Sequence, residues 1–178
     1  ESNQKCVGEK VCRRNSEVMR GKFMKEKVLV TGASGFIGTN LMEDLISKGY
    51  DVRNIDFKKP KISARSNLWK NVDITDFAAF EQEVLDFQPD YLVHLAARTD
   101  LDGKNLKDYD ANVTGVENLM KILHELPNLK KVIIASSKFV TRNGYKIKNQ
   151  FDYCPHTVYG ESKVETERRV WADRPACD

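Results

Sequence analysis

The segment from Val28 to Gly38 constrains the fold of this chain more than any other part of the sequence. A short apolar run leads into a turn with Gly-x-x-Gly-x-x-Gly spacing, and a helical pattern begins directly after it; the glycines are Gly32, Gly35 and Gly38. Glycines lack the Cβ atoms that would keep the backbone away from a phosphate, and a helix start adds free N–H groups and a positive dipole end. The pattern predicts a pyrophosphate-binding turn, although the same spacing also fits a simple strand-to-helix connection.

The residues after this turn favour the first interpretation. Apolar residues recur at helical spacing over 36–48, and Gly49 is placed to end that helix. The next predicted strand, 51–56, ends on Asp56, about 20 residues past the turn, where a carboxylate would bind the hydroxyls of an adenosine ribose. Asp56 favours NAD over NADP because it would repel a 2′-phosphate, whereas the Lys-Lys pair that begins two residues later could bind one.

Strand-like and helix-like patterns alternate along the rest of the chain. Further strands are predicted at 69–72, 91–95 and 131–135, with a loop at 142–150. Helices are predicted at 106–126 and 157–171, and Thr75 or Asp76 can cap another helix that runs through Phe87. This alternation predicts an α/β fold with a doubly wound parallel sheet. The right-handed crossover rule places the first and fourth strands side by side, and a ligand then lies beyond their carboxyl ends.

Residues 1–27 differ in charge from the rest of the chain. They hold eight Lys/Arg against four Asp/Glu, whereas the whole chain has 29 against 26. We therefore expect residues 1–24 to form a disordered basic leader and residues 25–178 to form one cofactor-binding domain. Nucleic-acid binding through the leader is the weaker alternative, because Phe23 is the one aromatic side chain there.

The sequence carries no evident targeting or metal-binding pattern. It has no apolar run of about 18 residues and no apolar segment of a signal peptide near its start, so we expect neither a membrane span nor export. The four cysteines form no Cys-x-x-Cys pair, and no histidine lies at zinc-ligand spacing. These observations predict a cytoplasmic protein with free thiols, without a metal site and without a membrane partner.

A second chemical signal lies near the C-terminal end of the sequence. Tyr159 and Lys163 are four residues apart in a predicted helix, so their side chains share one face. A Tyr-x-x-x-Lys pair alone occurs by chance about once in a few chains of this length. Here it follows the glycine turn and a strand that ends in Ser136-Ser137, and that combination is far more specific.

With these motifs in this order, the chain resembles the extended short-chain dehydrogenase/reductase superfamily, in its NAD-dependent sugar epimerase/dehydratase branch. The likeness runs from about residue 27 to residue 171. The segments that carry it are Thr31-Gly32-x-x-Gly35-x-x-Gly38, Asp56, Asp73-Ile74, His94-Leu95-Ala96-Ala97, Asn112-Val113-x-Gly115, Ser136-Ser137 and Pro155-x-x-x-Tyr159-Gly160-x-Ser162-Lys163.

The resemblance implies a set of cofactor contacts. The glycine turn would hold the pyrophosphate of NAD, Asp56 the adenosine ribose, Asp73 and Ile74 the adenine, and the alanines after the fourth strand the middle of the cofactor. The set includes Asn112, which alternatively braces its helix against neighbouring backbone. The residues are Gly32, Ser34, Gly35, Phe36, Ile37, Gly38, Asp56, Asp73, Ile74, Leu95, Ala96, Ala97, Asn112, Tyr159 and Lys163.

The same resemblance implies a catalytic group of Ser137, Tyr159 and Lys163. Tyr159 would be the general base or acid on a substrate hydroxyl, and Ser137 would hydrogen-bond the oxygen that is oxidised or reduced. Lys163 would stabilise the phenolate of Tyr159 and hold the nicotinamide ribose. Ser136 is the alternative to Ser137, and His94 is expected to pack at a strand end rather than to act in catalysis.

The residues after Ser137 depart from the family pattern. Dehydratases that resemble this chain carry an Asp-Glu pair directly after the Ser/Thr, whereas Lys138 and Phe139 occupy those positions here. The resemblance therefore favours epimerisation or carbonyl reduction over the loss of water.

The resemblance implies an NAD-dependent enzyme that acts on a nucleotide-activated sugar through a transient keto intermediate. Family members continue with a further strand and a substrate lobe, so the alternative is a cofactor-binding fragment without activity, with one sheet edge left unpaired. Family members often dimerise through the helices that correspond to 106–126 and 157–171, which makes a homodimer a further expectation.

Overall fold

The fold is built on a single parallel sheet. The structure is a computed structural model that describes residues 25–175, and the expected leader at 1–24 lies outside the described residues. Five strands pair in the order β3-β2-β1-β4-β5. In chain order they are β1 (Lys27–Thr31), β2 (Asp51–Asp56), β3 (Trp69–Asn71), β4 (Tyr91–His94) and β5 (Lys131–Ile134). β1 lies between β2 and β4, which confirms the predicted doubly wound sheet and the predicted pairing of the first and fourth strands.

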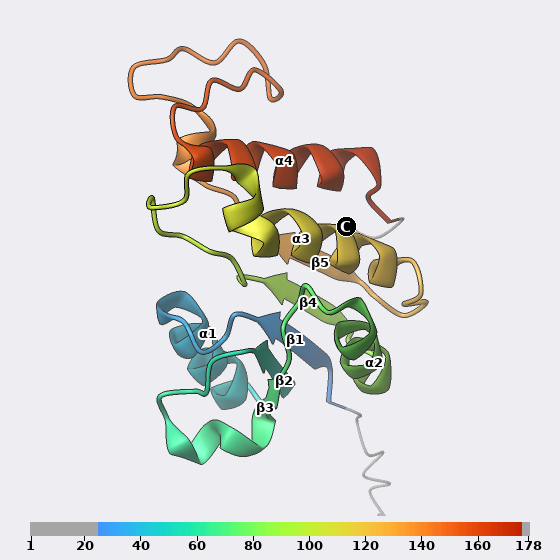
Figure 1. Cartoon of the computed structure of the whole chain (residues 1–178). Coiled ribbons are helices and arrows are strands. Elements are labelled where there is room, and N and C mark those ends of the chain that lie inside the picture. Colours follow the sequence, from blue (N-terminus) through green and yellow to red (C-terminus); the bar gives the residue numbers. More distant parts are fainter. Residues whose placement is uncertain (1–24, 176–178) are drawn as a thin grey trace, which may run out of the picture.

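Helices cover both faces of this sheet (Figure 1). The α-helices are α1 (Phe36–Ser47), α2 (Phe77–Phe87), α3 (Asp110–Leu123) and α4 (Val158–Ala172). Short 3₁₀ segments are η1 (Ser63–Leu68), η2 (Leu106–Tyr109) and η3 (Lys138–Val140). In Figure 1, α1 lies on one side of the strands, α2 and α3 lie on the other, and α4 runs along α3.

The side chains of β1 alternate between two apolar layers, one on each face of the sheet. Leu29 of β1 packs with residues of α2 and α3, whereas its neighbours Val28 and Val30 pack with Met42 of α1. Successive strand residues point to opposite faces of a sheet, so a strand buried on both faces needs a continuous apolar run. That requirement explains the Val-Leu-Val sequence before the glycine turn.

Local polar signals set the helix ends. Asp76, one of the two cap residues that the sequence allows, caps α2 by accepting the N–H of Ala79 at 3.2 Å, and Gly49 follows α1 with a φ of +86°. The predicted helix at 106–126 is wrong in its start, because Asn105 caps a separate 3₁₀ turn, η2, before α3 begins at Asp110.

Among residues 25–175, no helix combines the length and the apolar composition that a membrane span needs.

An ion-pair cluster joins the amino ends of β1, β4 and β5. The Lys130 ammonium lies 2.8 Å from the carboxylate of Glu26 and 3.0 Å from that of Asp90, which also accepts the N–H of Lys27 at 2.8 Å. The hydrogen bond from Lys130 holds the pKa of Glu26 below its ordinary value. These charges lie close in space but come from three separate segments, so the cluster fastens the strand starts to one another.

We expect Lys130→Met to lower the urea midpoint of unfolding at low salt. Folding depresses the pKa of Glu26, so the stability that this carboxylate contributes is present above its unfolded pKa of about 4.3 and is lost as the pH falls through the folded value. The gap between the wild type and the variant should therefore narrow in about 1 M salt and at acidic pH. A gap that stays constant under both conditions would contradict this account.

Candidate cofactor and catalytic site

Backbone contacts around the glycine turn leave no room for side chains. Gly32 has a φ of +70°, and a Cβ at this position would lie 2.6 Å from the backbone N of Ala96. A Cβ on Gly38 would lie 2.4 Å from the Cα of Ala33. α1 begins after Gly35 without a side-chain cap, so the N–H groups of its first turn have no intrahelical or capping partner. The turn can therefore bring free backbone donors close to an anion.

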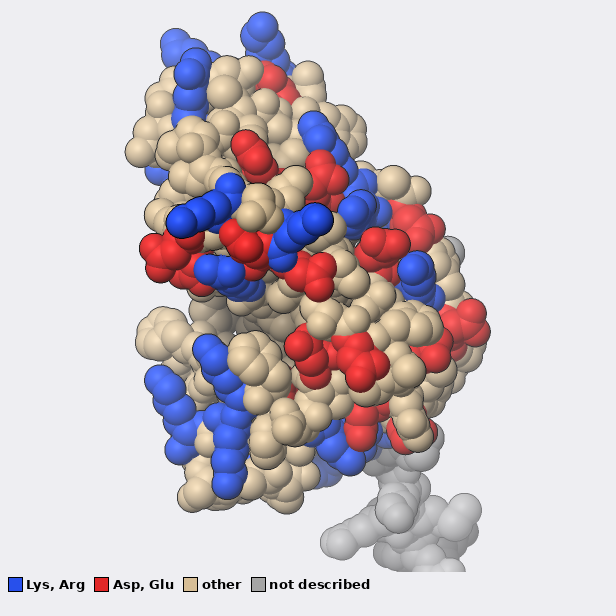
Figure 2. All heavy atoms as spheres, viewed as in Figure 1, with Lys and Arg blue, Asp and Glu red and all other residues tan. Residues whose placement is uncertain are grey.

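The turn opens onto a hollow beyond the carboxyl ends of the strands, which is visible between the two halves of the face in Figure 2. Two apolar side chains at the start of α1, directly after the turn, are exposed, Phe36 by 86% and Ile37 by 65%. Above the hollow, acidic and basic side chains are interspersed on this face, whereas Lys and Arg gather at its lower left. Large apolar side chains that lie exposed beside a hollow are typical of a surface that a ligand covers.

Asp56 fastens the glycine turn to the segment after β2. Its two carboxylate oxygens accept the N–H of Ser34 at 3.0 Å and that of Lys58 at 2.8 Å, and the residue is 8% exposed. The Ser34 hydroxyl donates to the carbonyl of Lys58 at 2.6 Å and accepts from Asn54 at 3.1 Å. Each carboxylate oxygen has a second lone pair, so Asp56 can still accept a hydroxyl from a ribose. The side chain of Ser34 therefore also links the glycine turn to β2 and to the segment after it.

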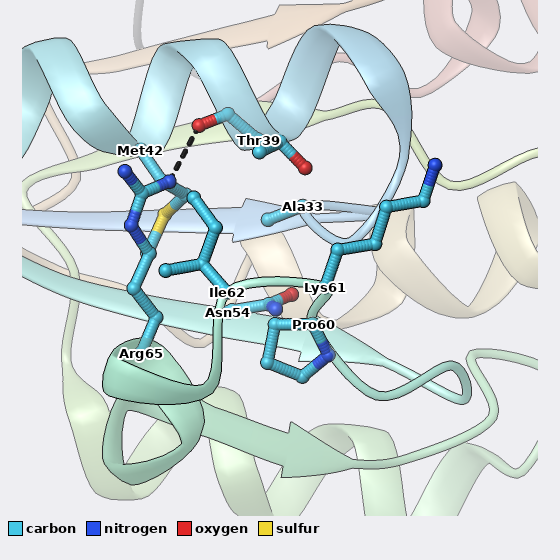
Figure 3. Close-up of a pocket in the computed structure, with 8 residues that line it drawn as sticks. All are labelled: Ala33, Thr39, Met42, Asn54, Pro60, Lys61, Ile62 and Arg65. Atoms are coloured by element: carbon cyan, nitrogen blue, oxygen red, sulfur yellow. Dashed lines mark hydrogen bonds between the residues drawn. The ribbon is translucent and has the colours of Figure 1, made fainter.

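A small cavity lies behind the turn, between α1, β2 and η1 (Figure 3). Arg65 reaches across it and donates to the carbonyl of Thr39 at 2.7 Å, while the side chain of Lys61 points away toward the turn. The cavity has a volume of about 10 Å³, which is near the least that a single water molecule needs. It is therefore a packing gap under the site and is too small to hold an adenosine.

The predicted adenine contacts, Asp73 and Ile74, take part in local structure. Asp73 accepts the N–H and the hydroxyl of Thr75 at 2.9 Å and 2.8 Å, and its side chain is exposed. Ile74 is 5% exposed and packs against α3, where a Cβ on Gly115 would lie 2.5 Å from its Cδ1. Its side chain is thus committed to the core, whereas that of Asp73 is at the surface.

The segment after β4 is fixed to the glycine turn. Leu95 donates its N–H to the carbonyl of Thr31 at 3.0 Å, and Ala96 donates to the Thr31 hydroxyl at 3.3 Å. These bonds hold Ala96 against Gly32, which explains why Gly32 can carry no side chain. Ala97 comes next and is half-buried. The structure therefore brings Gly32, Leu95 and Ala96 together as the sequence predicts.

Lys163 is buried at the carboxyl end of β5. Its ammonium donates to the carbonyl of Ala135 at 2.6 Å, and the residue is 4% exposed. Burial lowers the pKa of Lys163 to about 8, against a smaller opposing effect of Glu167. Burial, followed by the charge of Lys163, also lowers the pKa of His94 to about 3. His94 is therefore a neutral core residue, bonded through Nδ1 to the Thr31 hydroxyl at 2.8 Å, as the packing interpretation predicts.

We expect the unfolding free energy of the wild type to rise, relative to Lys163→Met, between pH 8 and pH 10. In this window the unfolded chain keeps its lysine protonated while the folded chain releases the proton, so unfolding binds protons and higher pH favours folding. The gain is on the order of 3 kcal/mol, because a pKa difference of one corresponds to about 1.4 kcal/mol. Urea midpoints of both proteins at pH 7, 8.5 and 10 measure it, and parallel curves would disprove it.

The two serines after β5 point to different partners. Ser136 donates its hydroxyl to the carboxylate of Glu167 on α4, whereas Ser137 caps η3 by accepting the N–H of Phe139 at 3.2 Å. Among the described residues, the hydroxyl of Ser137 donates no hydrogen bond, so its proton is available to an oxygen of a ligand. This difference favours Ser137 over Ser136 as the hydrogen-bond donor.

Aromatic rings surround Tyr159 at the start of α4. Its ring lies 5.7 Å from that of Phe139, edge to face, and 6.0 Å from that of Tyr109. Phe139 also stacks on His156 at 5.8 Å. The position where the sequence pattern of dehydratases has an acid is thus filled here by an apolar wall beside Tyr159.

Asn112 links α3 to the segment after β4 and to α4. Its amide accepts the N–H of Arg98 at 2.8 Å and donates to the carbonyl of Arg98 at 3.0 Å and to Ser162 at 2.9 Å. Asn112 is 1% exposed. These contacts confirm the bracing interpretation and leave no amide donor for a cofactor.

Sheet order, glycine turn and uncapped helix start together define a domain of the class that binds dinucleotides at the carboxyl edge of a parallel sheet. The chain belongs to the NAD dependent epimerase/dehydratase family, whose model matches residues 28–177. Among residues 25–175, no three or more His, Cys, Asp or Glu side chains are grouped so that they could hold a metal ion.

Several known proteins are similar to this chain. N-acetyl-alpha-D-glucosaminyl-diphospho-ditrans,octacis-undecaprenol 4-epimerase of Escherichia coli O157:H7 is 30% identical over 154 residues, which are 85% of this chain and 45% of that protein. The structure of UDP-glucose 4-epimerase from Thermotoga maritima with UDP-glucose has a TM-score of 0.72 and 26% identity, over 82% of this chain and 50% of that one. The Bordetella bronchiseptica enzyme WbmG in complex with NAD has a TM-score of 0.71 and 25% identity, over 88% and 52%. The chain spans about half the length of these relatives.

The sequence patterns did not identify residues that lie far from the catalytic motifs along the chain but near them in the fold. Tyr109 and Arg98 lie between the predicted motifs and match neither a turn nor a catalytic pattern, yet Tyr109 contacts Tyr159 and Arg98 lies over the ring of Tyr109. A tyrosine three residues before Asn112 on a helical pattern was the available signal, because Asn112 and a residue one turn earlier share a helix face.

Proposed function

We propose that this chain is the cofactor-binding part of an NAD-dependent enzyme that epimerises, oxidises or reduces a nucleotide-activated sugar. The observation that carries the proposal is the meeting of two motifs at one edge of the sheet. Gly32 packs on Ala96 after β4, and Lys163 bonds to Ala135 after the neighbouring β5. A pyrophosphate at the turn and a reacting group beside Lys163 would then share one cleft.

Ser137, Tyr159 and Lys163 form the catalytic group in this proposal. Bound NAD supplies the hydride acceptor. Tyr159 takes the proton of a sugar hydroxyl while the carbon that bears it gives up a hydride, and Ser137 donates a hydrogen bond to the same oxygen. Lys163, as an ammonium, stabilises the phenolate and holds the nicotinamide ribose. In epimerisation, Tyr159 would return its proton to the oxygen of the keto sugar as the carbon is reduced on its opposite face.

The side chains after Ser137 support epimerisation or reduction over dehydration. Loss of water needs a second acid or base beside the keto sugar, and Phe139 occupies that side of Tyr159 with an apolar ring. Lys138 is exposed. The substrate class rests on the relatives, two of which are epimerases of diphosphate-linked sugars by name.

We expect the chain to bind NAD saturably and to bind NADP at least about tenfold more weakly, a difference of about 1.4 kcal/mol. The buried carboxylate of Asp56 would repel the additional phosphate of NADP. Calorimetric titration of both cofactors at the same salt concentration measures the ratio. Equal or tighter binding of NADP, or no saturable binding of either, would contradict the proposal.

A second candidate is a cofactor-binding unit without turnover of its own. β5 is an edge strand of the described sheet, and Ile133 on it is 54% exposed. Beside β5 lies a groove of about 880 Å³ with a largely apolar lining: Met120, Leu123, Val132, Ile134, Val170 and Trp171. Saturable NAD binding, together with neither reduced cofactor nor an epimerised sugar when UDP-glucose is added, would favour this candidate.

A homodimer through α3 and α4 is retained as a proposal. The outward faces of these helices carry ion pairs, with Glu117 bonded to Lys121 on α3 and Glu165 bonded to Arg168 on α4. An interface built on them would be polar and salt-sensitive. Sedimentation velocity at low and high salt tests this, and a monomer under both conditions would rule it out.

A further inference from the structure

We propose that Tyr109 is the positioning residue of this site: it sets the place of the Tyr159 ring and, with its hydroxyl, the loop 98–105. The inference deepens the proposed function, because it names the group that holds the proposed catalytic phenol. Tyr109 is 0% exposed and lies at the end of η2, where α3 begins. It belongs to none of the sequence motifs.

Two pairs of residues fix α3 against α4 in register. Tyr109 contacts Tyr159 ring to ring at 6.0 Å, and Asn112 bonds to Ser162 at 2.9 Å. Asn112 comes three residues after Tyr109, and Ser162 comes three residues after Tyr159, so the two contacts lie about one helical turn apart. Thr166 extends the series by donating to the carbonyl of Asn112 at 2.8 Å. The position of Tyr159 therefore follows from the register that these contacts impose.

The ring of Tyr109 is held on its other sides as well. The Arg98 guanidinium lies 5.2 Å from the ring centroid of Tyr109 and is itself bonded to Asp100 and to the carbonyl of Asp108. Phe139 contacts Tyr159 edge to face at 5.7 Å. Tyr159 thus sits between two aromatic side chains, of which Tyr109 is the buried and immobilised one.

The hydroxyl of Tyr109 organises the loop that follows β4. It donates to the carbonyl of Asp100 at 2.9 Å and accepts the N–H of Gly103 at 3.2 Å. A Cβ on Gly103 would lie 2.2 Å from the ring of Tyr109, so this glycine is required by the ring rather than by its own backbone angles. One side chain therefore links the loop that enters the site to the phenol on α4.

The test separates the ring of Tyr109 from its hydroxyl. Tyr109→Leu removes the ring and should reduce the nuclear Overhauser effect between the Tyr159 and Phe139 rings by at least half, whereas Tyr109→Phe should preserve it. Tyr109→Phe should instead accelerate amide exchange of Gly103 about tenfold, because one hydrogen bond is lost. Gly103→Ala forces the ring aside from the loop and should weaken the same ring-to-ring signal. Gly103→Ala therefore still tests the inference if Tyr109→Leu does not fold.

Controls make the outcomes decisive. Tyr145→Phe removes a hydroxyl that bonds Asp152 in a different loop and should change neither reading. In the Tyr109→Leu background, Gly103→Ala should have no additional effect, since its collision partner is absent. A Tyr159–Phe139 signal that persists in folded Tyr109→Leu or Gly103→Ala would overturn the inference. NAD titration of the wild type is independent of these readings: failure to bind NAD would refute the proposed function and leave the positioning result standing.

Discussion

Tyr159→Phe is expected to lower turnover of a nucleotide-activated sugar by about 10²–10⁴-fold while it changes the dissociation constant of NAD less than about twofold. The substitution removes one oxygen, the proposed acceptor of the substrate proton, and keeps the ring. The ring contacts with Phe139 and Tyr109 should survive, because neither depends on the hydroxyl. A loss of activity can then be attributed to proton transfer.

Tyr145→Phe provides the matched control for this experiment. It removes the same atom from a loop where the phenol bonds only to Asp152 among the described residues, so turnover should stay at the wild-type level. Formation of reduced cofactor in single-turnover mixtures of NAD and UDP-glucose gives the rate of the chemical step. Wild-type activity in Tyr159→Phe would remove Tyr159 from the mechanism, and a parallel loss of NAD affinity would indicate a structural effect.

Gly38→Ala is expected to destabilise the fold by about 3 kcal/mol, the upper end of the range for overpacking, and to abolish measurable NAD binding. The new Cβ would lie 2.4 Å from the Cα of Ala33 and 2.7 Å from the carbonyl oxygen of Gly32. Both are backbone atoms and cannot swing away as a flexible side chain could. The turn would have to move as a unit, and the N–H groups at the start of α1 would move with it.

Two glycines of the same chain serve as controls. A Cβ on Gly35 would meet only the carbonyl oxygen of Gly32, at 3.2 Å, so Gly35→Ala should cost less stability than Gly38→Ala. Gly144 has a φ of +77° in open space, so Gly144→Ala tests backbone strain alone and should leave NAD binding intact. Urea midpoints and NAD titration distinguish the three variants. Equal stability of Gly38→Ala and Gly144→Ala would show that the collision does not govern the turn.

Most of the fold could be predicted because its determinants are local. The strand before the glycine turn, the cap at Asp76 and the stop at Gly49 each follow from a few neighbouring residues. The start of α3 at Asp110 could not be predicted in this way. A capping box at Asn105 and Asp108 makes a separate 3₁₀ turn, and apolar periodicity does not distinguish this turn from the first turn of an α-helix.

The motifs of the candidate site could be predicted from the sequence. The burial, the pKa and the hydrogen-bond partners of the individual side chains could not. The spacing of Tyr159 and Lys163 predicts a shared face, but burial of Lys163 and the resulting fall of its pKa to about 8 depend on packing around Ala135. Likewise, the family resemblance favours Ser137 but keeps Ser136 as an alternative, because the two serines are adjacent in the sequence. Glu167, which is 31 residues away along the chain, engages one of them.

The sequence by itself determined the order of strands and helices, the glycine turn and the family resemblance, because each depends on residues that are close together along the chain. The tertiary structure alone decided which polar groups are satisfied within the protein and which are left for a ligand. Asn112 is satisfied by Arg98 and Ser162, whereas the Ser137 hydroxyl keeps its proton available. It also placed Tyr109 beside Tyr159, 50 residues further along. Contacts between residues so distant in sequence arise only when helices pack, and no local pattern encodes their register.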